Sequence, residues 1–242
     1  MHIESVLETL HALRADGKFE EAFEFSKEHL AGQAQFQSII FQHKPIFWSN
    51  IKAGVCELTR RNAQDCEFVR QLWRDSDFIY RFHRHAPELP ATDARLREIL
   101  NAEYIATLAE SKAIHWVVRC KHKKPWGLLS LTEISMAHQR AEVLLGVLPG
   151  APMGLSTAAM LILFQFFFKA IHFNKLISYV YDDNAHSLKG TVHLGFQIEG
   201  VLKRHAMDPK TGSFVNLRQL GLLQENAFSP GNAVLMKRLL SR

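Results

Sequence analysis

Near the N-terminus, apolar side chains recur at the spacing of one helical face, every three or four residues, until Asp16-Gly17 ends the pattern. The recurring residues are Ile3, Val6, Leu7, Leu10 and Leu13. A second helix is predicted over 18–30, and Gly32 ends it. Residues 33–50 are too apolar for a free linker, so we expect them to lie across the main domain or a second subunit.

Short apolar runs, several alternating with polar residues, replace the helical spacing farther along the chain. Runs of this length that are rich in Val, Ile and Leu predict strands. The expected strands are 54–58, 114–120, 126–134, 141–148, 175–181, 201–207 and 214–220. Two of their connections, 121–124 and 208–212, have the composition of tight turns.

Helical patterns separate some of these strands. One helix carries Phe68 and Leu72 and breaks at Asp75, and another begins at Thr92 and runs to about Lys112. Residues 78–90 between them are expected to be irregular. Three more helices are predicted: 157–173, a short one after Asn184, and 232–240.

This order of elements predicts a mixed α/β (α+β) fold. The central sheet should be mostly antiparallel and flanked by helices, with a helical hairpin at the N-terminus. The chain contains neither GxGxxG nor GxxxxGK[ST], so the Rossmann and P-loop classes are disfavoured. At 242 residues we expect a helical extension over 1–48 and one main domain over 49–242.

Composition and charge narrow the class further. The chain is 47% hydrophobic with a formal charge of +5, which is typical of a globular protein and suits an anionic small ligand. The basic run 119–124 fits a solvated hairpin tip better than a nucleic-acid contact. Cys56, Cys66 and Cys120 form no CxxC pair, which favours reduced thiols and a cytoplasmic location.

We expect no membrane segment, no signal peptide and no metal. The apolar stretch 155–173 is interrupted by Gln165, Lys169 and His172, so a buried helix explains it better than a membrane span. No charged region followed by an apolar one opens the chain. His83, His85 and His138 lack the spacing of metal ligands.

The stretch 141–200 has a layout suited to a phosphate-bearing ligand: a strand, the compact loop 149–156, a helix, a strand and a short helix. Its later part, Asn184-x-x-Ser187 followed by Leu194-Gly-Phe-x-x-Glu-Gly200, resembles the GNAT superfamily of N-acetyltransferases. The run 127–134 together with the run 138–142 also resembles this superfamily. The resemblance spans about 55–223 and is nearest to the ribosomal-protein-alanine and spermidine acetyltransferases.

The resemblance implies acetyl-CoA as co-substrate, bound beside the strand 141–148. Backbone groups of about Leu145 and Val147 would pair with the pantetheine arm. The loop end would present amides and a helix N-terminus to the pyrophosphate, and the next helix would flank the thiol end. These two sets are Gly154, Leu155, Ser156 and Thr157 in the loop, and Asn184 and Ser187 after it.

Two positions depart from the family pattern. The loop 151–156 keeps one clear glycine and lacks the Gln or Arg with which the family loop normally begins. It also contains Pro152, which has no N–H. Thr191 stands where many members carry the Tyr that protonates the leaving thiolate, and a Thr hydroxyl is a far weaker acid than a phenol. His193 is near this position, but two residues along a helix is a different face.

Glu133 and Glu142 are the candidate general bases, because both lie on strands expected to face the cofactor gap. A solvent-facing role for Glu133 and an ion pair of Glu142 with Arg140 are the alternatives. Glu199, in the family motif, is interpreted as structural.

The predicted function is acyl-CoA-dependent N-acyl transfer, most simply of acetyl, by direct attack in a ternary complex. The acceptor is expected to be a small-molecule amine such as an amino sugar or polyamine, or a protein N-terminus, contacting 78–90 and 208–212. Two alternatives stay open: a non-catalytic GNAT-fold binding module, and a donor carried by an acyl carrier protein. In both, the N-terminal hairpin, whose turn 17–22 resembles one tetratricopeptide unit, would dock a protein partner; a homodimer is a further possibility.

Overall fold

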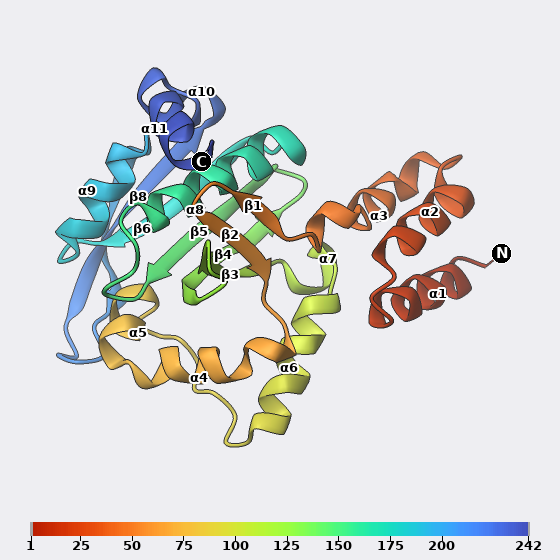
Figure 1. Ribbon diagram of the computed structural model, residues 1–242, viewed down its shortest axis with the longest axis horizontal. Coiled ribbons are helices and arrows are strands. Elements are labelled where there is room, and N and C mark those ends of the chain that lie inside the picture. The colour runs from red at the N-terminus through yellow and green to blue at the C-terminus, as the bar shows by residue number, and fades with distance from the viewer. Residues whose placement is uncertain (1, 242) are drawn as a thin grey trace.

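A single eight-stranded sheet runs through the computed structural model, which describes residues 2–241 (Figure 1). Its strand order is β1-β2-β3-β4-β5-β6-β8-β7, and every neighbouring pair is antiparallel except β5 and β6. The strands are β1 (Ile51–Ala53), β2 (Cys56–Arg60), β3 (Ile114–Cys120), β4 (Pro125–Ser135), β5 (Arg140–Val147), β6 (Lys175–Tyr181), β7 (Gln197–Met207) and β8 (Phe214–Leu223). The mixed, mostly antiparallel sheet expected from the sequence is therefore confirmed.

Helices cover both faces of this sheet (Figure 1). On one face, called here the α8 face, lie α8 (Leu155–Phe164) with its π-helical continuation η4 (Gln165–Ala170), α9 (Ala185–His193), α10 (Gln224–Ala227) and α11 (Pro230–Leu240). On the other, the α5 face, lie η3 (Ala63–Asp65), α4 (Cys66–Arg74), α5 (Ser76–Phe82) and α6 (Asp93–Ile105). Side chains of successive strand residues point to opposite faces of the sheet, so Trp116 packs with α8 while Val117 packs with α4 and α5.

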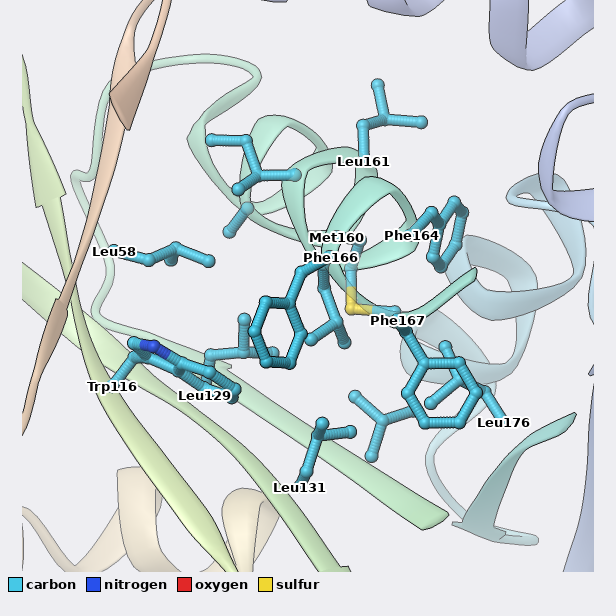
Figure 2. Close-up of a cluster of buried hydrophobic side chains, with 14 of the residues drawn as sticks. Leu58, Trp116, Leu129, Leu131, Met160, Leu161, Phe164, Phe166, Phe167 and Leu176 are labelled. Atoms are coloured by element: carbon cyan, nitrogen blue, oxygen red, sulfur yellow. The ribbon is translucent and has the colours of Figure 1, made fainter. Parts of the chain in front are cut away.

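The main core lies between the sheet and α8. Figure 2 shows Met160 and Phe166 pointing toward the sheet residues Trp116, Leu129 and Leu131, and the Phe166 and Trp116 rings are 5.4 Å apart, edge to face. Every residue of α8 from Ala158 to Phe164 is buried, because helices and strands surround it. Within the described chain, no helix is both long and apolar enough to cross a membrane.

The N-terminal helices form a small unit with its own apolar cluster: α1 (Ile3–Ala15), α2 (Phe19–Leu30), η1 (Ala34–Phe36) and α3 (Gln37–Gln42). The next turn, η2 (Pro45–Phe47), packs in the main core through Phe47. Arg14, which is buried, joins this unit to the rest by hydrogen bonds to the Ile105 carbonyl at 2.9 Å and the Glu110 carboxylate at 2.9 Å. Phe19 stacks on Trp48 at 4.7 Å within the main core. Of the segment 33–50, the part from Phe41 to Trp48 packs on the main core, while Phe36, Ile39 and Ile40 pack in the N-terminal cluster. The domain boundary at 48 stays a prediction.

Two predicted segments differ in the structure. Residues 78–90 are not irregular throughout, because Asp75 ends α4 and its side chain also accepts the Phe78 amide, which starts α5. The single helix expected over 92–112 is two helices, α6 and α7 (Leu108–Ser111). The break falls at Thr107, which forms a capping box with Glu110 and restarts the helix.

Candidate active site

The parallel strands β5 and β6 separate after three paired residues. Arg140, Ala141 and Glu142 pair with 175–177, and no pairing between the two strands continues beyond Ile177 within the described chain. On its other side β5 stays paired with β4 as far as Val147. One edge of β5, from Val143 to Val147, is therefore open, and the gap is closed at Glu142.

The backbone of β5 offers hydrogen-bonding groups to this open edge. The Leu148 amide donates to the Trp126 carbonyl of β4 at 2.8 Å. Peptide groups of successive strand residues turn to opposite edges, and the β4–β5 register is regular from Glu142 to Val147. The peptide groups of Leu145 and Val147, the two residues predicted from the resemblance, therefore face the gap.

The predicted phosphate loop ends at the N-terminus of α8. Gly154 caps this helix with φ +83°, a left-handed conformation that favours glycine, and a Cβ there would lie 3.0 Å from the Leu239 side chain of α11. The Leu155 amide donates to the Pro152 carbonyl at 3.1 Å, so it is already paired. The Ser156 and Thr157 amides have no hydrogen-bond partner within residues 2–241, which leaves two donors and the positive end of the helix dipole for an anion.

Asn184 and Ser187 form the N-cap of α9. The Asn184 side-chain oxygen accepts the Ser187 amide at 3.1 Å, and the Asn184 amide donates to the Tyr181 carbonyl at 2.9 Å. Because β5 and β6 are parallel, the starts of α8 and α9 follow the same end of the two strands, where the gap is open. Thr191 is half-buried on α9, and His193 is exposed.

Glu142 lies where the two strands part, on the α5 face. Burial, and then the charge of Glu133, raise the pKa of its carboxyl to about 7. Glu133 is exposed, with φ +49°, at a register irregularity of β4 between Thr132 and Ser135. The structure thus brings the two candidate bases together, and the described chain shows no ion pair between Glu142 and Arg140.

Helix α5 and the turn after it bridge the gap on this face. A Cβ on Gly146 of β5 would lie 2.6 Å from the Phe82 ring and 2.9 Å from the Phe78 ring, so α5 packs directly on the strand backbone. Across the gap, the Arg84 guanidinium lies 3.9 Å from the centre of the Tyr181 ring of β6. Helix α5 and Arg84 therefore cover the α5 face of the gap at the level of Gly146 and Tyr181.

Arg84 is the centre of a buried cluster that sequence reasoning missed. Its guanidinium lies between the rings of Tyr181 and Tyr80, 4.2 Å from the latter, and forms ion pairs with Asp183 and, at 3.3 Å, with Asp208. The Tyr80 hydroxyl donates to Asp208 at 2.6 Å, a bond that, with the Lys210 amide, lowers the pKa of Asp208.

The cluster joins the two segments that were expected to contact the acceptor, 78–90 and 208–212. The His85 imidazole also bonds the Met207 carbonyl at 2.6 Å. No local pattern marks Arg84, because its partner Asp208 lies 124 residues away in the chain.

No group of three or more His, Cys, Asp or Glu side chains is arranged to hold a metal ion in the part of the chain that the structure describes. Glu199 forms an ion pair with Lys175 at 2.6 Å, packed over Gly221, which agrees with a structural role.

Comparisons with known proteins show the family and the fold of this chain. Residues 57–197 match the family model described as an acetyltransferase (GNAT) domain. No curated protein matches the sequence.

Solved structures share the fold at low sequence identity. A spermidine N-acetyltransferase from Vibrio cholerae in complex with CoA and spermine aligns with a TM-score of 0.62 and 19% identity, over 72% of this chain and 98% of that one. A putative acetyltransferase aligns with a TM-score of 0.62 and 22% identity, over 78% and 93%. A dodecameric structure of the Vibrio cholerae enzyme aligns with a TM-score of 0.59 and 20% identity, over 72% and 96%.

Proposed function

Because the chain belongs to the GNAT acetyltransferase family, we propose that it transfers an acetyl group from acetyl-CoA to a primary amine bound on the α5 face of its sheet. One observation supports this most directly. The gap between β5 and β6 opens beside free peptide groups and the N-terminus of α8, and it closes at Glu142, a carboxylate with a pKa raised to about 7.

The residues present fit acetyl-CoA. Outward peptide groups of Leu145 and Val147 would hold the extended pantetheine arm by strand-like hydrogen bonds. Gly154 and the free amides of Ser156 and Thr157 would hold the pyrophosphate. When bound, acetyl-CoA supplies an acetyl group activated as a thioester.

Glu142 would remove the proton from the attacking amine. A base must be unprotonated in order to act, and a pKa near the working pH combines a large ionised fraction with useful basicity. Glu133, whose charge raises that pKa, also adds a second negative charge beside the closed end of the gap. Two carboxylates there favour an acceptor that carries further cationic amines, such as a polyamine, over a neutral one.

The test is a titration of acetyl-CoA, CoA and longer acyl-CoAs against thermal stability, followed by free-thiol release over a panel of amines. Acetyl-CoA at about a hundred times its Kd should raise Tm by roughly 5–10 °C. The panel contains one member of each acceptor class: spermidine, an amino sugar and a peptide with a free N-terminus. If none of these donors stabilises the protein, the proposal is contradicted, and the alternative of a donor carried by an acyl carrier protein remains. Stabilisation without thiol release from any amine would favour the binding module.

Gly154→Ala is expected to weaken CoA binding about tenfold. The new Cβ must adopt a left-handed φ of +83° and lies 3.0 Å from Leu239, so the first turn of α8 shifts and its two free amides move with it. Isothermal titration with CoA measures the change. Gly150→Ala is the matched control, because Gly150 has a φ of +81° in the same loop but no atom within 4 Å of its Cβ position. Equal losses of affinity in both variants would contradict the specific role of Gly154.

A further inference from the structure

Acetyl transfer requires a second proton movement besides the one assigned to Glu142, and this inference rests on the proposed function. As the amine nitrogen bonds to the acyl carbon, the carbon–sulfur bond breaks and leaves a thiolate. Glu142 takes the proton of the amine. A proton donor near the closed end of the gap would neutralise the sulfur and prevent the reverse attack.

The strand register shows which side chain lies at that level. Glu142 is opposite Ile177, the last paired residue, so continuing the count along the diverging strands sets Leu144 level with Tyr179 and Gly146 level with Tyr181. Alternate residues of a strand share a face. Tyr181 contacts Arg84 on the α5 face, so Tyr179 also lies on that face, where Glu142 is.

A pantetheine arm that pairs with Val147 and then with Leu145 would lie along the open edge of β5, with its thiol end toward Glu142. Its sulfur would then lie about one residue step beyond Leu145, toward Glu142. This is the level of Val143 and Leu144, and hence of Tyr179 across the gap. Tyr181 is two residues nearer the open end, beneath Arg84.

We propose that the Tyr179 hydroxyl donates its proton to the departing sulfur. Tyr179 is half-buried, and within residues 2–241 its hydroxyl makes no hydrogen bond, so it is available to a ligand. The other candidates fit less well. Thr191 on α9 has a hydroxyl that is too weak an acid, and His193 is exposed on the same helix.

The step balances in protons and electrons. The amine loses one proton to Glu142, the C–N bond forms as the C–S bond breaks, and the sulfur keeps the electron pair of that bond and gains the Tyr179 proton. The Tyr179 phenolate recovers a proton from Glu142 or solvent before the next turnover. The products are an amide and free CoA thiol.

Tyr179→Phe tests the proposal in the complex with CoA. A phenol that bonds the sulfur stabilises its thiolate, so the variant should raise the pKa of the bound CoA thiol by about one unit, measured by the ultraviolet absorbance of the thiolate. The kcat for thiol release should fall about tenfold to a hundredfold, with KM for acetyl-CoA nearly unchanged. Binding of desulfo-CoA, which lacks the sulfur, should be the same in both proteins.

Tyr181→Phe is the matched control, since it removes the same hydroxyl from the same strand and face. It should leave the pKa of the bound thiol unchanged. A thiol pKa that is equal in wild type and Tyr179→Phe, or that moves instead in Tyr181→Phe, overturns the assignment. Failure of wild-type protein to bind CoA at all overturns the proposed function with it, so the two failures are distinguishable.

Discussion

Glu142→Gln is expected to lower kcat/KM for amine acetylation about a thousandfold. The carboxylate is the only base placed at the closed end of the gap with a raised pKa among the described residues, and general-base catalysis contributes on the order of 10²–10⁴ in rate. Gln keeps the size of the side chain but takes no proton. Free-thiol release with the best amine of the panel measures the loss.

The pH profile should identify the same group. Wild-type kcat/KM should fall tenfold per pH unit below about 7, because protonated Glu142 is inactive as a base. Glu142→Gln should lose this acidic limb. Glu133→Gln should keep most of the activity but shift the limb to lower pH, since the Glu133 charge helps to raise the pKa of Glu142.

The thermal stability of Glu142→Gln shows whether a loss of activity comes from unfolding. In the folded chain the pKa of Glu142 is about 7, above its ordinary value of 4.5. Between these two pH values folding takes up a proton, and above them the ionised carboxylate opposes folding. Glu142→Gln should therefore have a Tm at about pH 8 at least equal to that of wild type. Full activity of the variant, or an unchanged acidic limb, would reject Glu142 as the base.

Arg84→Met is expected to lower Tm by roughly 6–20 °C. The change leaves the buried Asp208 carboxylate without its cationic partner and removes the cation between the two tyrosine rings. Methionine fills similar space along the stem, so the loss reports charge and stacking more than volume. Thermal unfolding at neutral pH measures the change.

Lys210→Met is the matched control for the same cluster. Lys210 lies over the Tyr80 ring at 4.0 Å and pairs with Asp77 at 3.7 Å, but its side chain is half exposed. Exposed pairs contribute about 1 kcal/mol or less, so its Tm should change by only a few degrees. Similar Tm losses for Lys210→Met and Arg84→Met would show that burial of Arg84 has no special effect.

The sequence allowed the β5–β6 region to be predicted because its signals are local. Glycines, a helix start and an Asn N-cap each specify their own backbone, as at Gly154 and Asn184. The nearness of Glu133 to Glu142 followed from two neighbouring strands joined by a short turn.

The covering of the gap by α5 and Arg84 was not predictable in the same way. Arg84, Asp183 and Asp208 come from three segments, and only the closed sheet sets them side by side. The role of Gly146 depends on contact with Phe82, which no local pattern shows. The helix α5 was missed because the seven residues Ser76–Phe82 are too few to show a period.

The contact between Leu239 and Gly154 has a consequence for the order of synthesis. Leu239 also accepts the Val55 amide at 3.3 Å, so α11 is held against both the β1–β2 turn and the start of α8. On a ribosome, residue 154 emerges well before residue 239, and during that interval the predicted phosphate loop has no support from α11. The nascent chain should therefore acquire affinity for CoA late, after most of its sheet can already form.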